Sequence, residues 1–234
     1  MDEQHAVSVN FARPMPLFPL STAAMLPQQV VPLHIFEPRY RQMVEHVLDG
    51  AGQIAIGVFH GAHWKQEYHG NPPIRPFVCI GQMVQHEKLP EGRYNILLHG
   101  ICRARVRELL PPDADHEYRR VTLEPMQGEG DESDLAASRE RLERALSSDP
   151  LEQMTTAEPI LEYLRNAEVP TSAVLELVSF TMISDPEVRY QLLAEPDAAS
   201  RAEIIEQELG ELSVLLRKAR NQHPERWPKG CSWN

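Results

Sequence analysis

The chain has 234 residues, of which 42% are apolar and 24% charged, and its formal net charge is −11. This composition is typical of a globular protein with room for one large or two small domains. No stretch approaches the roughly 20 apolar residues that cross a bilayer, and the N-terminus lacks the pattern of a secretory signal. Three cysteines without a CxxC pair favour a reducing compartment, so we expect a cytoplasmic protein without a membrane anchor.

The charge is divided unevenly along the chain. Residues 1–126 hold 12 Lys and Arg against 13 Asp and Glu, whereas residues 127–234 hold 11 against 21. This shift in composition predicts two domains, joined by a linker rich in Gly and acidic residues at 127–132. The strongly acidic second part is poorly suited to a nucleic-acid phosphate backbone.

The first part contains several short apolar runs. Residues 14–20 are apolar but interrupted by prolines, which predicts an edge strand or an extended segment. The run 30–35 predicts a core strand. It leads into a helix over 38–48, because Pro38 has its φ pre-set for a first helical turn.

Further strands are expected downstream of this helix, at residues 53–59, 77–86, 94–99, 102–110 and 118–124. Gly81 suggests a bulge, and Gly100 suggests a sharp bend between two strands. Seven short strands with one helix predict a small closed or half-closed β-domain at 14–126.

The second part has apolar residues at helical spacing. Helices are expected from 133 or 134 to 146, from about 156, from a cap at Thr171, after Asp185, and from 198 to 220. Asp185-Pro186-Glu187 is a clear helix start because it supplies a cap acceptor, a proline and a first-turn carboxylate. We therefore expect an acidic α-helical bundle at 131–220 and a tail containing Trp and Pro at 221–234.

Four segments of the chain resemble the Lon substrate-binding domain family, the N-terminal domain of Lon-type ATP-dependent proteases. They are residues 17–20 (LFPL), 31–40 (VPLHIFEPRY), 81–87 (GQMVQHE) and 92–100 (GRYNILLHG). The resemblance is specific in the β-half, looser in the helices, and covers roughly residues 14 to 218. It implies an α+β fold in which a PUA-like β pseudobarrel is followed by a C-terminal α-helical bundle.

The catalytic parts of Lon proteases have no counterpart in this sequence. Those enzymes carry a G-x-x-x-x-G-K-[ST] phosphate loop and a Ser–Lys dyad, whereas this sequence has no Gly-Lys dipeptide and four lysines, none in a dyad-like context. We therefore expect a free-standing recognition domain with no catalytic residue, metal or cofactor. Its expected partner is unfolded or degron-bearing polypeptide, or a separately encoded protease or ATPase for which it is an adaptor.

Candidate peptide-binding residues lie in segment 31–40 and at the rim where two long strands meet. They are His34, Phe36, Arg39, Tyr40, His86, Arg93 and Tyr94. An extended chain would lie in an apolar groove between the β-domain and the bundle, or pair with the edge at 14–20. For Glu37 and Arg39 we favour structural roles at the strand-to-helix joint. Glu37 would lie near the helix N-terminus, and Arg39 would pair with a carboxylate or a strand-end carbonyl.

Two other clusters support weaker alternatives. His60, His63 and His69, with Glu67, have spacing that can serve zinc, but no fourth ligand is placed nearby. Arg103, Arg105 and Arg107 alternate along one strand and raise RNA binding by a PUA-like module. Few lysines and no aromatic stripe argue against nucleic acid. A small-ligand- or RNA-binding PUA-like module is the alternative function.

Overall fold

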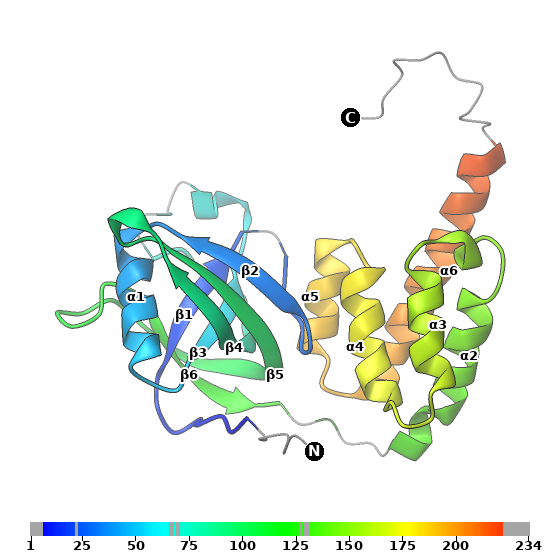
Figure 1. Cartoon of the computed structure of the whole chain (residues 1–234), viewed down its shortest axis with the longest axis horizontal. Coiled ribbons are helices and arrows are strands. Elements are labelled where there is room, and N and C mark those ends of the chain that lie inside the picture. Colours follow the sequence, from blue (N-terminus) through cyan, green and yellow to red (C-terminus); the bar gives the residue numbers. More distant parts are fainter. Residues whose placement is uncertain are drawn as a thin grey trace, which may run out of the picture. The chain divides into compact units, whose positions relative to one another are not determined.

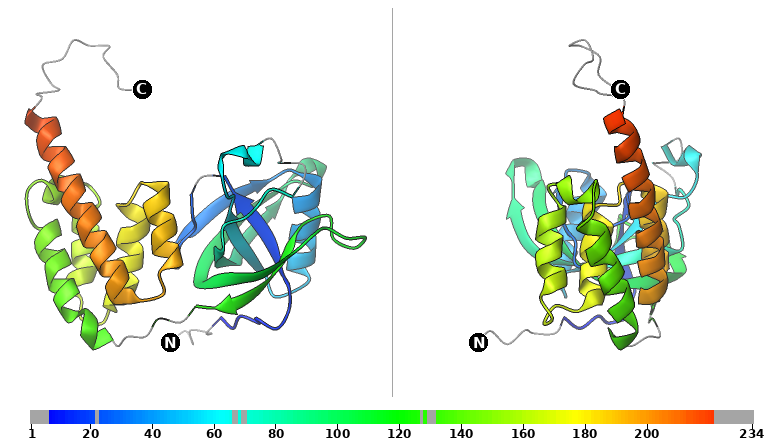
Figure 2. Two further views of the ribbon diagram at one scale, coloured as in Figure 1. Left: turned by 180° about the vertical axis from the view of Figure 1, so that it is seen from behind. Right: turned by 90° about the vertical axis from the view of Figure 1, so that its right-hand side faces the viewer.

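The computed structural model of the chain describes residues 7–21, 23–65, 68, 71–126, 128 and 132–221. The described residues fall into two compact units, one within residues 1–129 and 184–197 and the other within residues 130–183 and 198–234. Figures 1 and 2 show a strand-rich first unit and a helical second unit.

The first unit is built on a six-stranded sheet, five strands of which close into a barrel (Figure 1). Its strands are β1 (Met15–Leu20), β2 (Val30–Ile35), β3 (Gln53–Val58), β4 (Phe77–Lys88), β5 (Tyr94–Leu110) and β6 (Arg120–Pro125). The strand order is β2-β5-β4-β3-β1-β6, and a further pairing of β5 with β6 closes the barrel. The first half of β5 pairs with β2 and β4, and its second half pairs with β4 and β6.

Strand β5 continues through Gly100, where the sequence suggested a bend between two strands. The glycine is needed for a different reason. A Cβ atom at this position would lie 2.3 Å from the backbone oxygen of Leu26, so a side chain cannot fit. A register shift lies between Ile80 and Gly81, where a bulge was expected, but the extra residue is Ile101 on the partner strand β5.

Strand β1 is an interior strand, which corrects the expectation of an edge at 14–20. Its first residues pair with β6, and Leu17 to Leu20 pair in parallel with β3. Pro16 pairs with β6 and Pro19 with β3. Each proline pairs with only one of the two neighbouring strands, and each stretch of pairing is short. Neither proline therefore prevents β1 from lying between β3 and β6.

The barrel core is formed by small and branched side chains. They include Leu17, Ala55, Val78, Ile80, Ala104, Val121 and Leu123. Helix α1 (Pro38–Leu48) buries Tyr40, Met43, Val44 and Val47, and the Tyr40 ring lies 4.7 Å from that of Phe18, centroid to centroid. The predicted bounds of β2 and α1 are confirmed.

Helix α5 (Pro186–Ala194) belongs to the first unit, whereas the sequence analysis placed it in the bundle. The Tyr190 hydroxyl accepts a hydrogen bond from the Phe77 amide at 2.9 Å. Arg75 lies 3.4 Å over the Tyr190 ring and pairs with Glu187 at 2.9 Å. Asp185 caps the helix as predicted, accepting from the amides of residues 187 and 188.

The second unit is a bundle of helices. These are α2 (Ala136–Leu146), α3 (Ala157–Arg165), α4 (Thr171–Thr181) and α6 (Ala198–Asn221), with short 3₁₀ turns at Glu132–Leu135 and Leu151–Gln153. Their core contains Leu142, Ile160, Val178, Ile205 and Leu209. The fold class, a PUA-like β pseudobarrel and a C-terminal α-helical bundle, is confirmed. The tail at 222–234 lies outside the described residues.

Candidate functional site

Strand β2 lies at the free edge of the sheet. Among the described residues it pairs only with β5, from Val30 opposite His99 to Ile35 opposite Tyr94. The amide of Gly100 donates to the Gln29 carbonyl at 2.9 Å. This bond sets the phase of the antiparallel ladder.

The phase decides which backbone groups of β2 remain unpaired. In an antiparallel ladder every second residue bonds to the same neighbouring strand. Because Gln29 bonds to β5, the residues at the same spacing, which are Val31, Leu33 and Ile35, also bond to β5. The backbone groups of Val30, Pro32 and His34 therefore point away from β5. Pro32 has no amide hydrogen, so the proline falls where the ladder to β5 loses no donor.

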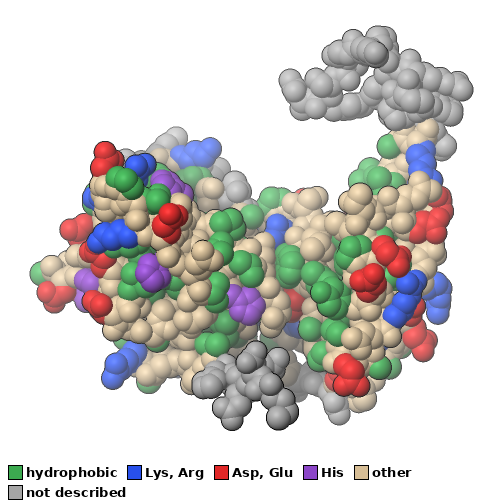
Figure 3. Space-filling view, viewed as in Figure 1, with side chains coloured by type: hydrophobic (Ala, Val, Ile, Leu, Met, Phe, Trp, Pro, Cys, Tyr) green, Lys and Arg blue, Asp and Glu red, His purple; other side chains and the backbone are tan. Residues whose placement is uncertain are grey.

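The same three residues and Phe36 place their side chains on the outer face of the sheet. Val30 is 54% exposed and Phe36 is 61% exposed. The rings of His34 and Phe36 stack with centroids 6.1 Å apart. In the space-filling view, hydrophobic and histidine side chains lie among charged ones on the visible face of this unit (Figure 3).

A polar row crosses three strands beside these rings. His34 Nδ1 lies 2.8 Å from Asn95 Oδ1, and Asn95 Nδ2 donates to Glu87 at 3.2 Å. Because Asn95 presents its oxygen to the imidazole, the contact is a hydrogen bond when His34 has its proton on Nδ1. The row fixes the imidazole beside the exposed Phe36 ring.

A shallow depression of about 390 Å³ lies across β2, β5 and β4. It is lined by Pro32, Leu33, His34, Gln85, His86, Glu87, Asn95, Ile96 and Leu97. Val84, 56% exposed, lies at a bulge in the neighbouring part of β4. The site is thus an unpaired strand edge next to a half-apolar, half-polar sheet face, a combination that suits an extended peptide.

The family model for the ATP-dependent protease La (LON) substrate-binding domain matches residues 14–210. The chain belongs to this family. The Lon protease of Desulfosudis oleivorans is 22% identical over 208 residues, and Lon protease 1 of Syntrophobacter fumaroxidans is 27% identical over 223 residues. The alignments cover 87% and 94% of this chain but 24% and 26% of those proteins, so the chain spans about a quarter of their length.

Solved structures agree on the fold. The N-terminal domain of a Mycobacterium avium complex Lon protease superposes with a TM-score of 0.65 at 15% identity, covering 85% of this chain and 98% of that one. A Lon N-terminal domain protein from Xanthomonas campestris gives 0.55 at 19% identity, covering 82% and 95%. At this level of identity the likeness is one of fold.

The seven residues proposed from the sequence are placed very differently in this LON substrate-binding domain. His34, Phe36 and His86 lie on the outer face at β2 and β4. Tyr40 and Tyr94 are only 6% and 2% exposed. This burial removes both rings from the surface and corrects the expectation that they anchor a partner.

Arg93 lies at the turn between β4 and β5, where its Nε donates to the Pro90 carbonyl at 3.3 Å. Arg39 pairs with Glu37 at 2.9 Å, the structural role favoured from the sequence. Tyr68 donates its hydroxyl hydrogen to Glu37, and burial together with this bond raises the pKa of the phenol. The peptide-binding role of the exposed residues stays a prediction.

The arginine row on β5 does not form a free basic stripe. Arg103 is 8% exposed and donates to the Leu192 carbonyl of α5 at 3.2 Å. Arg105 and Arg107 both pair with Glu124, at 3.5 and 3.3 Å. Both side chains therefore share one carboxylate on the neighbouring strand β6.

Five further residues of this surface were not proposed from the sequence: Val30, Gln85, Glu87, Asn95 and Leu97. The short turn at 89–92 sets the register of β4 against β5, and that register places Glu87 opposite Asn95. Counting residues outward from this turn along both strands would have predicted the Glu87–Asn95 pair.

The proposed histidine metal cluster includes His69 and Glu67, which lie outside the described residues. Within the described ranges, no three His, Cys, Asp or Glu side chains are grouped to hold a metal, and no helix there could span a membrane.

Proposed function

We propose that this chain is a non-catalytic polypeptide-recognition domain that binds extended segments by adding them as a strand to the edge of β2. The observation that carries the proposal is the outward direction of the backbone groups of Val30, Pro32 and His34, beside the exposed Phe36. The family's description as a substrate-binding domain of a protease supports polypeptide as the ligand.

The edge offers a defined set of main-chain bonds. Val30 and His34 each present one donor and one acceptor, and Pro32 presents an acceptor alone. Since each bond contributes about 0.5–1.5 kcal/mol net, about five bonds barely offset the cost of ordering the bound chain. Side-chain contacts must supply the remaining affinity, so we expect weak binding that tolerates many sequences.

The outer face determines which segments bind best. An added strand places every second side chain beside Val30, His34 and Phe36, two of which are apolar. We therefore expect preference for clients with apolar residues at alternate positions. Such segments are exposed in unfolded proteins and buried in folded ones.

The test compares two changes at one residue. His34→Pro removes an outward amide without removing a bond to β5, whereas His34→Ala keeps the amide and removes the imidazole. We expect H34P to weaken binding of a fluorescent apolar peptide and of a permanently unfolded protein far more than H34A, with Phe36→Ala in between. Thermal melting checks that each variant is folded. Equal affinities for H34P and H34A would overturn strand addition.

Pro32 provides a test by gain of function. Pro32→Val supplies the missing donor at the centre of the edge, so we expect tighter peptide binding. The same change removes an obstacle to pairing between two copies of β2. Analytical ultracentrifugation should therefore show more self-association in P32V than in the wild type. A variant that binds no better and remains as monomeric as the wild type contradicts the proposal.

Two finer forms of the function are distinguished by what binds in a lysate. If the client is unfolded or degron-bearing protein, heterogeneous polypeptides are captured, and capture falls in H34P. If the chain is an adaptor for a separately encoded protease or ATPase, one folded partner is captured instead. We expect neither ATP hydrolysis nor proteolysis by the purified chain; ATP-dependent cleavage would contradict a recognition-only role.

A further inference from the structure

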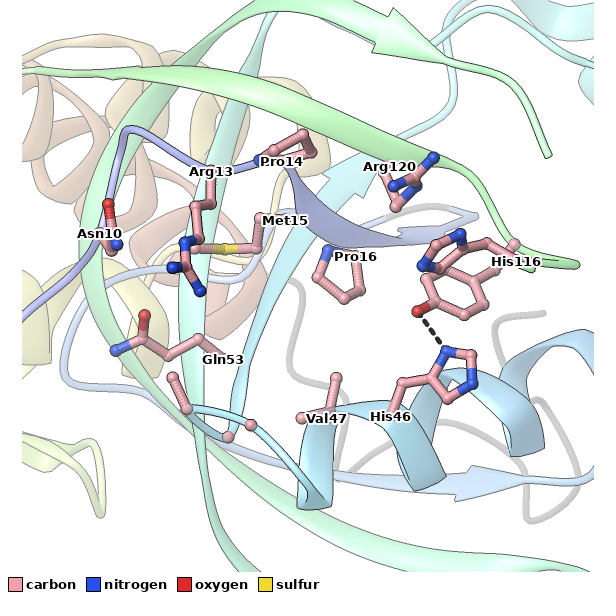
Figure 4. A pocket seen from close by; sticks show the side chains of 14 residues that line it. Asn10, Arg13, Pro14, Met15, Pro16, His46, Val47, Gln53, His116 and Arg120 are labelled. Carbon is pink, nitrogen blue, oxygen red and sulfur yellow. Dashed lines mark hydrogen bonds between the residues drawn. The ribbon is translucent and has the colours of Figure 1, made fainter. Parts of the chain in front are cut away.

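The first unit contains a second cavity, of about 350 Å³, away from β2. Its walls come from the segment before β1, the end of α1, the turn into β3, and residues 116–120 (Figure 4). This volume lies at the small end of the range for ligand pockets.

The lining is cationic in a chain whose net charge is −11. Arg13, Arg120, His46 and His116 line the cavity, and no Asp or Glu is among its lining residues. In Figure 4, Arg13 lies on one side of Pro16, and His46 and His116 lie on the other. The cavity therefore presents nitrogen donors from both sides.

Several of these donors have no acceptor within the described part of the chain. Arg13 is exposed and makes no hydrogen bond or ion pair there. Arg120 Nε is buried and lacks a partner. His46 Nδ1 lies 2.9 Å from the Tyr118 hydroxyl, and when Nδ1 accepts from that hydroxyl, the proton on Nε2 is free to donate. A buried donor without an acceptor is a cost that a bound anion would remove.

One carboxylate lies just outside the cavity and sets its net charge. Asp113 pairs with Arg120 Nη2 at 2.5 Å and with His116 Nδ1 at 2.9 Å. Apart from the imidazoles, two arginines and this aspartate give a formal charge of +1, which matches a carboxylate better than a doubly charged phosphate. Val47 also lines the cavity, and its backbone carbonyl at the end of α1 is already occupied, because it accepts hydrogen bonds from the amides of Gly50 and Gly52 at 3.1 and 3.2 Å.

The remaining walls are apolar. Pro14, Met15, Pro16 and Val47 line the cavity between the two groups of donors. They provide a surface for a compact hydrocarbon group attached to the anion. Neither the cations nor these apolar walls belong to the β2 site.

We infer that this cavity binds a carboxylate that carries a compact apolar group, with Arg13 as its principal partner. The free C-terminus of a polypeptide ending in an aliphatic residue and a free aliphatic carboxylic acid present the same chemistry. This inference does not depend on strand addition at β2, because it uses different residues and a different wall of the unit.

The test is calorimetric titration of the full chain with four probes. They are a tetrapeptide ending in leucine as the free acid, the same peptide as its C-terminal amide, 4-methylpentanoate, and inorganic phosphate. We expect the free acid to bind at least about tenfold tighter than the amide, since the charged hydrogen bonds are lost. Binding of 4-methylpentanoate as tight as that of the peptide acid shows that a free acid suffices. Binding of the peptide acid alone identifies the polypeptide C-terminus.

Arg13→Gln provides the variant, because removal of an exposed side chain without a partner leaves the fold intact. It should weaken binding of the peptide acid about tenfold. Arg144→Gln, which removes one exposed charge from α2, is the matched control and should have no effect. Equal binding of acid and amide, tighter binding of phosphate than of both carboxylates, or equal affinities of R13Q and R144Q would overturn the inference.

Discussion

Arg39 is a conspicuous charged residue in the sequence, and its contacts give it a structural role. Its guanidinium pairs with Glu37 at 2.9 Å and lies 4.6 and 4.9 Å from the ring centroids of Tyr40 and Tyr68. These contacts join the end of β2, the start of α1 and the segment after β3. The arginine therefore stabilises the joint from which the outer face of β2 extends.

Replacement of Arg39 by Ala should lower the free energy of unfolding by about 1–2 kcal/mol, because a half-buried ion pair and two cation–π contacts are lost. Peptide affinity should be unchanged. Arg93→Ala is the control, since its side chain is exposed and lies 3.8 Å from Glu91, and it should change stability by less than about 0.5 kcal/mol. Unchanged melting of R39A together with lost peptide binding would show that Arg39 is a ligand.

Gly100 and Gly210 can be compared directly, because they differ in the space available for a side chain. A Cβ at Gly100 would lie 2.3 Å from the Leu26 oxygen, whereas a Cβ at Gly210 in α6 meets nothing within 4 Å. We expect Gly100→Ala to destabilise the chain by about 2–3 kcal/mol and Gly210→Ala to stabilise it by about 0.5–1 kcal/mol. Chemical denaturation measures both; a neutral G100A would contradict the close approach at this point of β5.

At the scale of elements, α4 begins without a side-chain cap of its own. Its N-cap residue is Pro170, which makes no side-chain hydrogen bond. The carboxylate of Glu132, from the 3₁₀ turn before α2, accepts hydrogen bonds from the amides of Thr171 and Ser172 instead. Burial raises the pKa of Glu132, but these bonds outweigh it and lower the pKa overall.

The lowered pKa gives a signed prediction. A carboxylate with a depressed folded-state pKa contributes stability above its unfolded pKa, about 4.3, and loses it as pH falls through the folded value. Glu132→Gln should therefore lower stability by about 1 kcal/mol at pH 7, and the difference from wild type should vanish near pH 3. Glu162→Gln, an exposed position on α3, is the control. A difference for E132Q that persists at low pH would contradict the capping role of its charge.

Local signals predicted several elements well, and non-local pairing explains the errors. The apolar run 30–35, Pro38 and Asp185 carry their own start signals, and the structure confirms all three. The interior position of β1 depends on β3 and β6, which lie far away in the sequence. No residue within 14–20 reports those partners, so its prolines were interpreted as marks of an edge.

At the scale of the molecule, α5 differs most from the sequence-based division of the chain. Its residues lie between two helices of the second unit in sequence, yet it packs on the barrel through Tyr190 and Glu187. Composition could not reveal this, because α5, with one Glu and one Arg, carries no pattern that separates it from the helices on either side. The domain boundary predicted at residues 126–131 concerns independent folding of the two parts on either side of it, and it stays a prediction.

Hydrogen exchange can test this grouping. G100A destabilises the barrel, so α5 amides should lose protection together with those of β4 and β5. Leu142→Ala opens a cavity in the core of the second unit, and there α2, α4 and α6 should lose protection while α5 keeps it. Loss of α5 protection in L142A and not in G100A would return α5 to the bundle.

The two sites differed in how far the sequence could predict them. His34 and Phe36 lie in an apolar run with its own signature, so they were found. Glu87 and Asn95 join them only through the register of β4 and β5. The cavity at Arg13 is built by four separate segments, and no spacing along the chain connects them.

Strand addition requires the outward backbone groups of β2 to bond to the main chain of the bound peptide. The most direct measurement is the affinity of an apolar peptide in which each amide nitrogen is methylated in turn. Strand addition predicts a period of two: methylation of the amides that face β2 abolishes binding, and methylation of the intervening amides changes it less than about twofold. A uniform effect along the peptide, or none, would contradict the account.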